Sequence, residues 1–463
     1  MAGICNVAWA ADEYFGIYMQ GVKVGYSFSG EIDLKNQFPA VKESNSYSLL
    51  NSKLLGTNLD MELKSKTRYD VKGNLLWLES ITTSNGRKQT VVATIKANTI
   101  LIKVDNSGQI QNSTIKIPKG VRVVDDATAG ITLNDFASLK NGVVVHVLDP
   151  TTVSLVPNTI IYLGKKTELI NGFGTSVDVV EVRETRAITR LLFSAKGDLV
   201  RMEGPMGMEV RPESKAIAMD LSGNTRPDLA TVTSIQVKPP VERPWMLKSM
   251  SFELTTPDSS LNLISDRNQT ATRLASGWKV TLNPVDPKLS QPTTIAKAKA
   301  AQPKWAQASL HIASKNPQII ALSKKIIGKE VNPVIATQKI CDWVNGNMTN
   351  NAGIGVLRDA TEVLKTKEGV CRDYAILSAA LLRASGIPTK LVSGMIYDLD
   401  AFYYHAWVEV YSGSQWVPFD PTRSHQQFAA THLKLAEGNV EDAFIFKVLD
   451  RTTLKVTGLI YRS

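Results

Sequence analysis

The sequence predicts an α+β protein, with a large antiparallel β-rich N-terminal region followed by a smaller part that contains helices and strands. From about Tyr14 to Leu221, apolar and polar residues alternate in short runs rich in Val, Ile, Thr and Tyr. This alternation is typical of half-buried strands. From about Trp305 the apolar residues change to helical spacing. A chain of 463 residues exceeds what one hydrophobic core usually supports, so we expect two to four domains.

Breaks in composition predict the domain boundaries. The segment Lys238 to Pro244 contains three prolines and interrupts the β pattern, because proline cannot donate to a β-ladder. An Ala- and Lys-rich passage before Pro303 fits a tether or a short exposed helix. The predicted divisions are a signal-peptide remnant (1–11), a β-rich domain of one or two β units (12–225), a small β module (226–290), a linker (291–304), a core with helices and strands (305–430) and a C-terminal β extension of the core (431–463).

The first residues resemble the end of a secretory signal. Ala8-Trp9-Ala10 fits the A-x-A pattern before a cleavage point, and polar residues follow it. We therefore expect export and a periplasmic or secreted location in the cell envelope. No run of about 18 apolar residues is present, so no transmembrane segment is expected. The three cysteines exclude a disulfide framework, and the residue before Cys5 does not fit a lipid-anchoring site.

The formal net charge of +10 favours contact with acidic surfaces such as anionic envelope polymers. The basic residues are scattered and are not interleaved with aromatic residues as in a nucleic-acid groove. We therefore expect a solvated basic surface and no nucleic-acid partner.

Three helices are predicted between Asn332 and Pro388. Asn332 followed by proline is a favourable helix start, and Cys341 lies in this helix beside its apolar face, which predicts core packing. Asp359 with Glu362 three residues later is typical of a capping box, which predicts the second helix. The third helix begins at Cys371 and is predicted to end before Pro388, because Gly386 is a helix stop and proline prevents continuation.

Cys371 is the candidate nucleophile because a thiol in the first turn of a helix meets the partial positive charge of unpaired N–H groups. This effect is worth roughly 0.3–1 kcal/mol, which lowers a thiol pKa by well under one unit. The helix alone therefore does not ionise the thiol. A histidine must accept the proton.

His405 is the best placed of the five histidines. It lies in an alternating run that predicts a strand, and a turn at Ser412 to Ser414 leads into a return strand that ends near Asp420. Counting across this hairpin places Asp420 opposite position 405 or 406. The rival carboxylate, Glu409, is four residues along the strand from His405, or about 13 Å away, which is too far for a hydrogen bond.

These residues predict a catalytic triad in which Cys371 attacks a carbonyl carbon, His405 takes and returns the proton, and Asp420 orients the imidazole. The backbone N–H of Cys371 is a candidate oxyanion donor, and spacing identifies no second donor. Asp373 is predicted to complement the helix dipole, although it is also a candidate second acid. Context predicts the places of other aromatic and histidine side chains. Tyr403 and Tyr404 are expected in the substrate cleft or on a sheet surface, Trp407 and Trp416 in packing near the site, and His425 and His432 in solvent.

Four ordered blocks of this region resemble the bacterial transglutaminase-like core, which has a papain-like α+β fold. The blocks run from Gly369 to Ala375, from Leu381 to Pro388, from His405 to Val410 and from Trp416 to Thr422. The resemblance covers about 335–422. A weaker one, from Tyr14 to Tyr26, is to the opening of exported bacterial members with a large β region before the core.

The resemblance implies helices packed on an antiparallel sheet and cysteine acyl-transfer chemistry, with Cys371, His405 and Asp420 as nucleophile, base and orienter. Family members include proteases, amidases, protein cross-linkers and inactive binding proteins. In the cross-linkers a tryptophan upstream of the cysteine helps to hold the oxyanion. Trp343 and Asn347 are candidates for that role but stay outside the predicted catalytic set. No calcium-ligand cluster like that of the animal cross-linkers is evident.

The sequence therefore predicts an exported cysteine peptidase, amidase or acyltransferase that acts on an amide bond of a protein, peptide or peptidoglycan. Hydrolysis is preferred to cross-linking because water needs no second binding site. No cofactor or metal is expected. The alternative is a catalytically idle envelope protein that binds partners through its β domains.

Overall fold

The computed structural model describes residues 13–462, apart from 35–38, 129–130, 132–134, 171, 185–186, 259–260, 288–292, 424–427, 444–448 and 450. The predicted signal-peptide remnant, with Cys5, and His425 lie outside the described residues. The chain divides into two compact units, residues 1–228 (unit 1) and 229–463 (unit 2).

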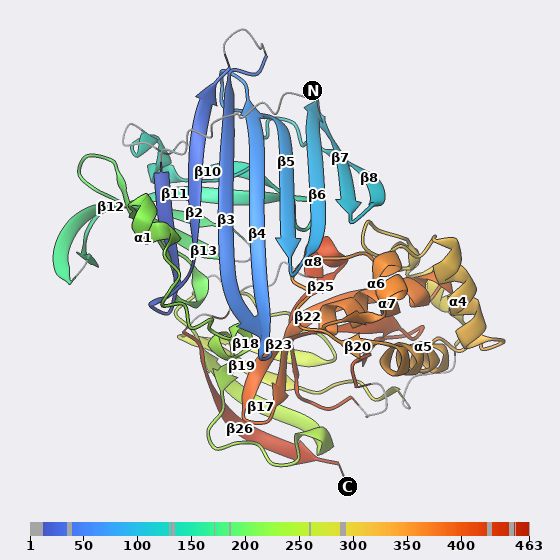
Figure 1. Cartoon of the computed structure of the whole chain (residues 1–463). Helices are drawn as coiled ribbons and strands as arrows, with labels where there is room; N and C mark the ends of the chain where they lie inside the picture. Colours follow the sequence, from blue (N-terminus) through green and yellow to red (C-terminus); the bar gives the residue numbers. More distant parts are fainter. Residues whose placement is uncertain are drawn as a thin grey trace. The chain divides into compact units, whose positions relative to one another are not determined.

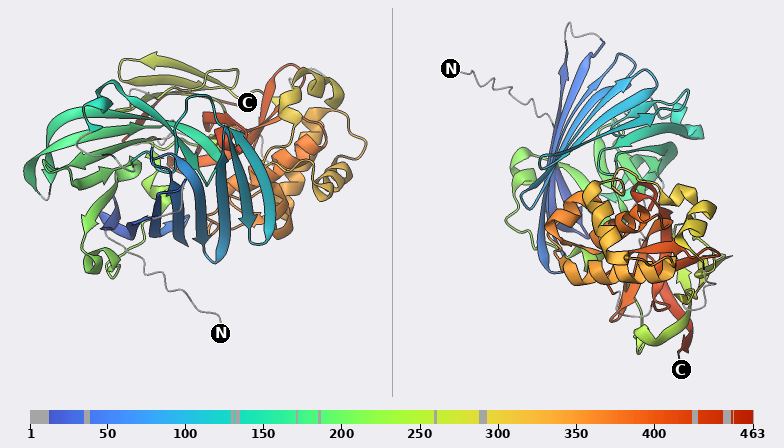
Figure 2. Two further views of the ribbon diagram at one scale, coloured as in Figure 1. Left: turned by 90° about the horizontal axis from the view of Figure 1, so that it is seen from above. Right: turned by 90° about the vertical axis from the view of Figure 1, so that its right-hand side faces the viewer.

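Unit 1 is built on one large sheet of fifteen strands, shown from three directions in Figures 1 and 2. The order is β8-β7-β6-β5-β4-β3-β2-β1-β15-β14-β13-β12-β11-β10-β9, so two runs of sequential strands meet where β1 pairs with β15. All pairs are antiparallel except the short pair β9 and β10. The predicted large antiparallel β region is therefore confirmed.

The first run of strands has these bounds: β1 (Glu13–Met19), β2 (Val22–Asp33), β3 (Lys42–Leu54), β4 (Thr57–Tyr69), β5 (Leu75–Ser84), β6 (Arg87–Lys96), β7 (Thr99–Asn106) and β8 (Gln109–Lys116). The second run contains β9 (Val123–Val124), β10 (Val143–Asp149), β11 (Ser154–Ile170), β12 (Phe173–Arg183), β13 (Ile188–Phe193), β14 (Leu199–Glu203) and β15 (Met208–Glu213), followed by the helix α1 (Lys215–Met219).

The alternation in the sequence explains why these segments are strands. In β7, Ile100, Ile102 and Val104 are buried while the residues between them are more exposed. The turn to β8 is closed by Gly108, whose φ of 95° favours glycine and whose N–H donates to the Asp105 side chain at 2.7 Å.

Unit 2 contains two sheets and a group of helices. One sheet has the order β16-β23-β22-β25, with β24 pairing to β23, and the other has the order β18-β19-β17-β26. The bounds are β16 (Ile235–Gln236), β17 (Leu247–Thr255), β18 (Gln269–Leu274), β19 (Gly277–Leu282), β22 (Thr389–Asp398), β23 (Ala401–Tyr411), β24 (Trp416–Phe419), β25 (His432–Gly438) and β26 (Thr453–Tyr461). A short parallel pair joins β20 (Thr349–Asn350) to β21 (Glu368–Gly369).

The predicted module at 226–290 does not form a sheet by itself. Strand β26, which comes from the predicted C-terminal extension, pairs with β17 along its length. The short strand β16 joins the other sheet through β23. The sequence predicted these segments as separate parts, because pairing between strands about 200 residues apart leaves no local pattern.

Two helices of unit 2, α5 and α6, begin at the predicted caps. Asn332 accepts hydrogen bonds from the backbone of Val334 and Ile335, and Asp359 accepts them from Thr361 and Glu362. The bounds are α2 (Leu229–Val232), α3 (Ile295–Ala301), α4 (Pro317–Ile327), α5 (Pro333–Asn347), α6 (Ala360–Thr366), α7 (Cys371–Ala384) and α8 (Val440–Ala443). The predicted linker at 291–304 thus contains the short helix α3. No helix in the described part of the chain has both the length and the apolar character needed to span a bilayer.

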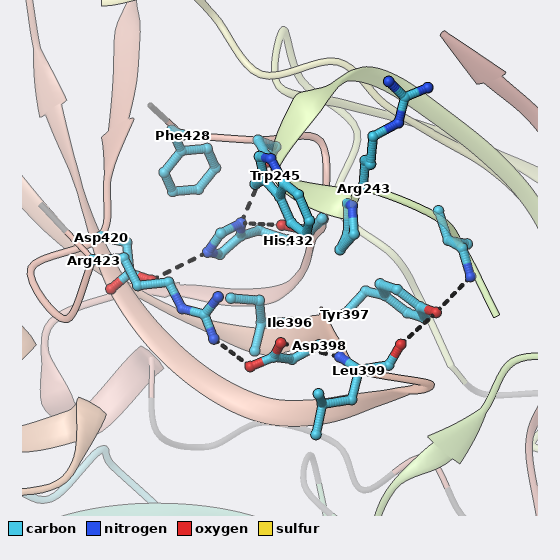
Figure 3. A pocket seen from close by; sticks show the side chains of 14 residues that line it. Arg243, Trp245, Ile396, Tyr397, Asp398, Leu399, Asp420, Arg423, Phe428 and His432 are labelled. Atoms are coloured by element: carbon cyan, nitrogen blue, oxygen red, sulfur yellow. Dashed lines mark hydrogen bonds and ion pairs between the residues drawn. The ribbon is translucent and has the colours of Figure 1, made fainter. Parts of the chain in front are cut away.

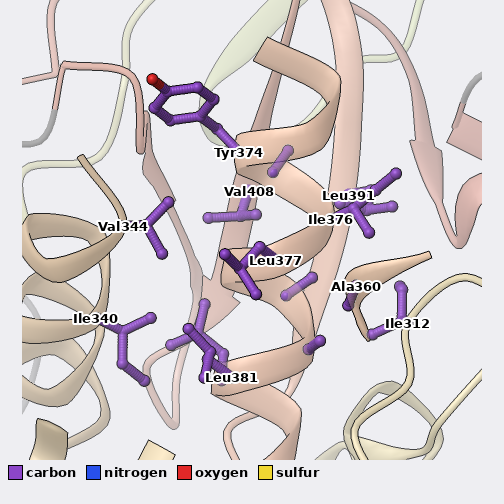
Figure 4. Packing of buried hydrophobic residues seen from close by; sticks show 14 of the residues in the cluster. Ile312, Ile340, Val344, Ala360, Tyr374, Ile376, Leu377, Leu381, Leu391 and Val408 are labelled. Carbon is purple, nitrogen blue, oxygen red and sulfur yellow. The ribbon is translucent and has the colours of Figure 1, made fainter. Parts of the chain in front are cut away.

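One hydrophobic core joins α5 and α7 to strands β22 and β23 (Figure 4). Val344 comes from α5, Leu377 and Leu381 from α7, Leu391 from β22 and Val408 from β23, and all five are fully buried. Burying a side chain of this size contributes about 1.5–3 kcal/mol. This core fixes the start of α7 relative to β23. The papain-like arrangement that the resemblance implies stays a prediction.

Candidate active site

Cys371 is the first residue of α7, and its side chain is partly exposed. Val370 precedes it as the helix cap, and the Asp373 carboxylate accepts a hydrogen bond from the Val370 N–H at 3.0 Å. The first N–H groups of a helix have no intrahelical acceptor. The thiol therefore lies at the positive end of a buried helix.

His405 and Asp420 come together at the side of this thiol. His405 Nε2 lies 2.9 Å from Asp420 Oδ2, and His405 lies near enough to Cys371 to lower the pKa of its thiol. The structure thus brings the three residues of the predicted triad together, in the order thiol, imidazole and carboxylate.

The strand register differs slightly from the predicted one. In the β23–β24 hairpin, Val408 pairs with Phe419, so the same register continued by one residue would place Asp420 opposite Trp407. The prediction placed Asp420 opposite 405 or 406. The count was wrong by one or two residues because the loop is longer than the predicted turn: Tyr411 pairs with Trp416, so residues 412–415 all lie in the loop. The side chain of Asp420 still reaches His405.

Asp420 is held by the turn that follows β24. Its Oδ1 accepts hydrogen bonds from the Thr422 N–H at 2.9 Å and the Thr422 hydroxyl at 2.7 Å. Helix α5 anchors the same turn, since Asn345 Nδ2 donates to the carbonyl oxygens of Pro421 at 3.1 Å and Thr422 at 2.8 Å. This leaves Oδ2 facing His405.

Interactions among the three groups change their pKa values in the direction opposite to the effect of burial. Burial alone would raise the pKa of Cys371, but the hydrogen bond and charge of His405, with a backbone hydrogen bond from Ala406, lower it below that of a free thiol. For His405, burial lowers the pKa, but the charge and hydrogen bond of Asp420, with a further contribution from Cys371, raise it to about 10. The pKa of Asp420 would rise on burial but is held well below its usual range by His405. This balance favours a thiolate–imidazolium pair.

His432 was predicted to be exposed, and this prediction was wrong. It is the first residue of β25, its side chain is 5% exposed, and its Nε2 lies 3.4 Å from Asp420 Oδ2. The error has a physical cause: β25 reaches the site by pairing with β22, a contact that no local pattern in the sequence reveals.

Asp373 and Glu409, the alternative acidic residues considered from the sequence, both have structural partners. Asp373 is buried, and Arg358 Nη2 lies 3.1 Å from its Oδ1. Glu409 is buried beside Lys434, with 2.7 Å between Lys434 Nζ and Glu409 Oε1. The choice of Asp420 over Glu409 therefore agrees with the contacts of both carboxylates.

The other candidates are placed as follows. Cys341 is fully buried in the core described above, which agrees with the predicted packing role, and burial raises the pKa of its thiol. Tyr404 is partly buried, and its hydroxyl accepts a hydrogen bond from the Leu449 N–H at 2.7 Å. Trp407 is buried and stacks on His405 with 6.4 Å between ring centroids. The Asn347 amide donates within α5, to the Trp343 carbonyl oxygen at 2.8 Å.

A pocket of about 410 Å³ opens beside Asp420 and His432 (Figure 3). Its wall contains Trp245, Phe428 and an ion pair between Arg423 and Asp398. Within the described part of unit 2, Asp420 alone of the predicted triad lines this pocket. The pocket therefore lies on the carboxylate side of the triad.

His405, Asp420 and His432 also form a group whose nitrogen and oxygen atoms lie within 4.8 Å of one another, so they could hold a metal ion. Two ligands of a tetrahedral zinc ion, each about 2.0–2.1 Å from the metal, are roughly 3.3 Å apart. The 2.9 Å between His405 and Asp420 is instead a hydrogen-bond distance. In the second group, Asp266, Glu409 and Glu437, the ammonium of Lys434 takes the cation's place.

Residues 320–421 match the model of the Transglutaminase-like superfamily. This part of the chain is therefore a transglutaminase-like domain.

Particular relatives match part of the chain. The chain is 31% identical over 116 residues to the uncharacterized protein ML0607 of Mycobacterium leprae, an alignment that covers 23% of this chain and 41% of that protein. It is 34% identical over 76 residues to the uncharacterized protein YebA of Bacillus subtilis, covering 13% of this chain and 10% of that protein. The chain thus spans less than half the length of either relative.

Two solved structures show distant likenesses. A candidate cysteine protease from Cytophaga hutchinsonii matches with 20% identity and a TM-score of 0.31, covering 47% of this chain and 85% of that one. A β-barrel-like protein of the DUF1849 type from Brucella abortus matches with 10% identity and a TM-score of 0.32, covering 43% of this chain and 94% of that one. At these TM-scores neither likeness identifies a fold.

Proposed function

We propose that the chain is a cysteine enzyme of the cell envelope that cleaves or transfers an amide bond through a thioester on Cys371. The contact chain from the Cys371 thiol through His405 to Asp420 supports this proposal most directly, because it lowers the pKa of the thiol despite burial. Protein, peptide and peptidoglycan amides are the proposed substrates, and hydrolysis is preferred to transfer.

The chemistry follows from the protonation states. The Cys371 thiolate attacks the carbonyl carbon, and the oxyanion that forms accepts a hydrogen bond from the Cys371 N–H at the start of α7. When the C–N bond breaks, the His405 imidazolium gives its proton to the departing amine. Asp420 holds the imidazole in place during this transfer.

The second half returns the enzyme to its starting state. Neutral His405 takes a proton from water, whose oxygen attacks the thioester carbonyl. The C–S bond breaks, the carboxylic acid leaves, and the Cys371 thiolate is again paired with the His405 imidazolium. An amine in place of water would give a new amide by the same steps.

A mass-spectrometric screen of envelope peptides and peptidoglycan fragments, with and without an added primary amine, tests the proposal. We expect products whose mass increases by one water on cleavage, an acyl adduct on Cys371, and no turnover by Cys371→Ala. Cys341→Ala is the matched control, since Cys341 is a buried core residue, and it should retain turnover. Turnover that survives in Cys371→Ala would overturn the proposal. A wild-type protein that gives no adduct or product would favour the idle binding protein instead.

A further inference from the structure

His432 is a buried histidine for which the proposed mechanism has no step. Its Nε2 lies 3.4 Å from Asp420 Oδ2, the oxygen atom that also contacts His405. We propose that His432 is a positioning residue: it donates a second hydrogen bond to Asp420 Oδ2 and so fixes the carboxylate that orients His405. This inference rests on the proposed function, because it assigns His432 a role in the same thiol chemistry.

The neighbours of His432 select the tautomer that this role needs. Thr431 Oγ1 lies 3.1 Å from His432 Nδ1 and can donate its hydroxyl proton to that nitrogen. The ring proton of neutral His432 then lies on Nε2, which faces Asp420. Burial lowers the pKa of His432, which favours a neutral ring. The longer contact from Nδ1 to the Ala429 carbonyl oxygen, at 3.4 Å, would need the proton on Nδ1, and a neutral ring would then turn an unprotonated Nε2 toward the Asp420 carboxylate.

Packing fixes the orientation of the ring. Phe428 stacks on His432 with 4.0 Å between centroids and 27° between planes, and Trp407 meets it edge-on at 5.2 Å. The backbone holds β25 close to β22 at Gly394, where an added Cβ would come within 1.9 Å of the Leu433 carbonyl oxygen. A ring held by two aromatic neighbours loses little further entropy when it donates a hydrogen bond.

The hydrogen bond from His432 also reduces the negative charge that Asp420 presents to His405 and Cys371. With His432 in place, both carboxylate oxygens have partners: Thr422 on Oδ1, and the two histidines on Oδ2. Without it, more negative charge faces His405 and Cys371, which raises the pKa of both groups. Among the residues that the structure describes, Asp420 and His405 are the ionisable groups in contact with His432, and the His405 ring lies 5.8 Å away. Arg423, across the pocket, is paired with Asp398.

The test is the rate at which iodoacetamide alkylates Cys371 in the full-length chain, followed by mass spectrometry between about pH 4 and pH 9. His432→Phe keeps an aromatic ring but removes the donor. We expect its rate at pH 7 to fall about tenfold, as for loss of one hydrogen bond to a charged group. On the acid side of the pH profile (the acid limb), the alkylation rate falls as pH decreases, and the midpoint of this fall should move to higher pH in the variant. His432→Gln places an amide donor near the position of Nε2 and should recover most of the rate.

Thr431→Val and Thr337→Val form a second, matched pair. Thr431→Val removes the hydroxyl that selects the tautomer, so its acid limb should move in the same direction by a smaller amount. Thr337 is also buried, and its hydroxyl donates within α5 to the Pro333 carbonyl oxygen at 2.7 Å, so Thr337→Val should keep the wild-type profile.

A His432→Phe protein that melts as the wild type does and keeps its pH profile overturns the inference. If His432→Phe does not fold, Thr431→Val decides in the same way, and an unshifted acid limb overturns it. If His405→Gln loses the fast labelling of Cys371 while His432→Phe and Thr431→Val keep it, the proposed function stands and only the role of His432 is removed. A wild-type Cys371 that reacts no faster than a free thiol removes the proposed function itself.

Discussion

The reactivity that we propose for Cys371 depends on a balance between burial and one neighbouring imidazole. Burial disfavours the thiolate, and the start of a helix recovers only about 0.3–1 kcal/mol. His405 supplies the larger opposing effect through its charge and hydrogen bond, and Asp420 raises the pKa of that imidazole. Each member of the triad therefore depends on the next.

Replacing His405 should reverse the sign of the pKa shift of the Cys371 thiol. In His405→Gln the imidazolium is gone and burial is unopposed, so the pKa of the thiol should rise above about 8.5, the value of a free cysteine. Alkylation at pH 7 should slow by more than tenfold, measured by mass spectrometry. His146→Gln in unit 1 is the control and should label at the wild-type rate. Equal rates in the two variants would contradict the assignment.

The same pKa values predict how the triad contributes to stability. The raised pKa of His405 makes its contribution complete below its unfolded value, about 6.5, and the contribution is lost as pH rises through about 10. The lowered pKa of Asp420 makes its contribution complete above its unfolded value, about 3.9, and the contribution is lost at lower pH.

Wild type should therefore exceed His405→Gln in thermal stability most clearly between about pH 4 and pH 6.5, and this difference should shrink toward pH 10. Thermal unfolding followed by tryptophan fluorescence across this range measures it, since six of the eight tryptophans lie in unit 2. A difference that grows with pH would show the opposite sign and exclude a protonated His405 in the folded state.

At the scale of elements, a buried ion pair supports the start of α7. Arg358 contacts the Asp373 carboxylate and also donates to the Thr366 hydroxyl at 2.9 Å and the Glu368 carbonyl oxygen at 2.5 Å. Asp373 in turn caps the helix through the N–H of Val370. One guanidinium thus joins α6, β21 and the turn that carries Cys371.

Arg358→Met should leave Asp373 buried without its charged partner and cost about 3–5 kcal/mol in the free energy of unfolding. Chemical denaturation followed by tryptophan fluorescence measures this loss. The control is Lys339→Met, which removes the exposed pair between Lys339 and Glu330 at 3.6 Å and should cost no more than about 1 kcal/mol. Similar losses in the two variants would contradict a supporting role for the buried pair.

Local patterns predicted the elements that carry two of the three triad residues. The helix starts at Asn332, Asp359 and Cys371 were predictable because caps act within one turn. The β23–β24 hairpin was also predictable, although its register was misplaced by one or two residues. The role of His432 was missed because it depends on pairing of β25 with β22, about 40 residues apart in the chain.

At the scale of the whole molecule, every residue of the candidate site belongs to unit 2. The alternating sequence predicted the β-rich character of unit 1, but not the pairing of β1 with β15, which joins segments nearly 200 residues apart. Export and an envelope location stay predictions from the first residues of the sequence.

The placement of the site predicts that residues 229–463, produced alone and folded, alkylate Cys371 at the rate of the full-length chain. The same segment carrying Cys371→Ala gives the background. Alkylation rates at pH 7, with circular dichroism to establish folding, make the comparison. A folded segment that labels slowly would mean that unit 1 takes part in activating the thiol.

The central claim is that Cys371 is a thiolate paired with protonated His405 near neutral pH. The direct measurement is the ultraviolet absorbance of the thiolate, taken as the difference between wild type and Cys371→Ala while the pH is raised. We predict a thiolate signal that is already present at pH 7 and that appears only at higher pH in His405→Gln. A wild-type signal that first appears above about pH 8.5, as for a free cysteine, would contradict the account.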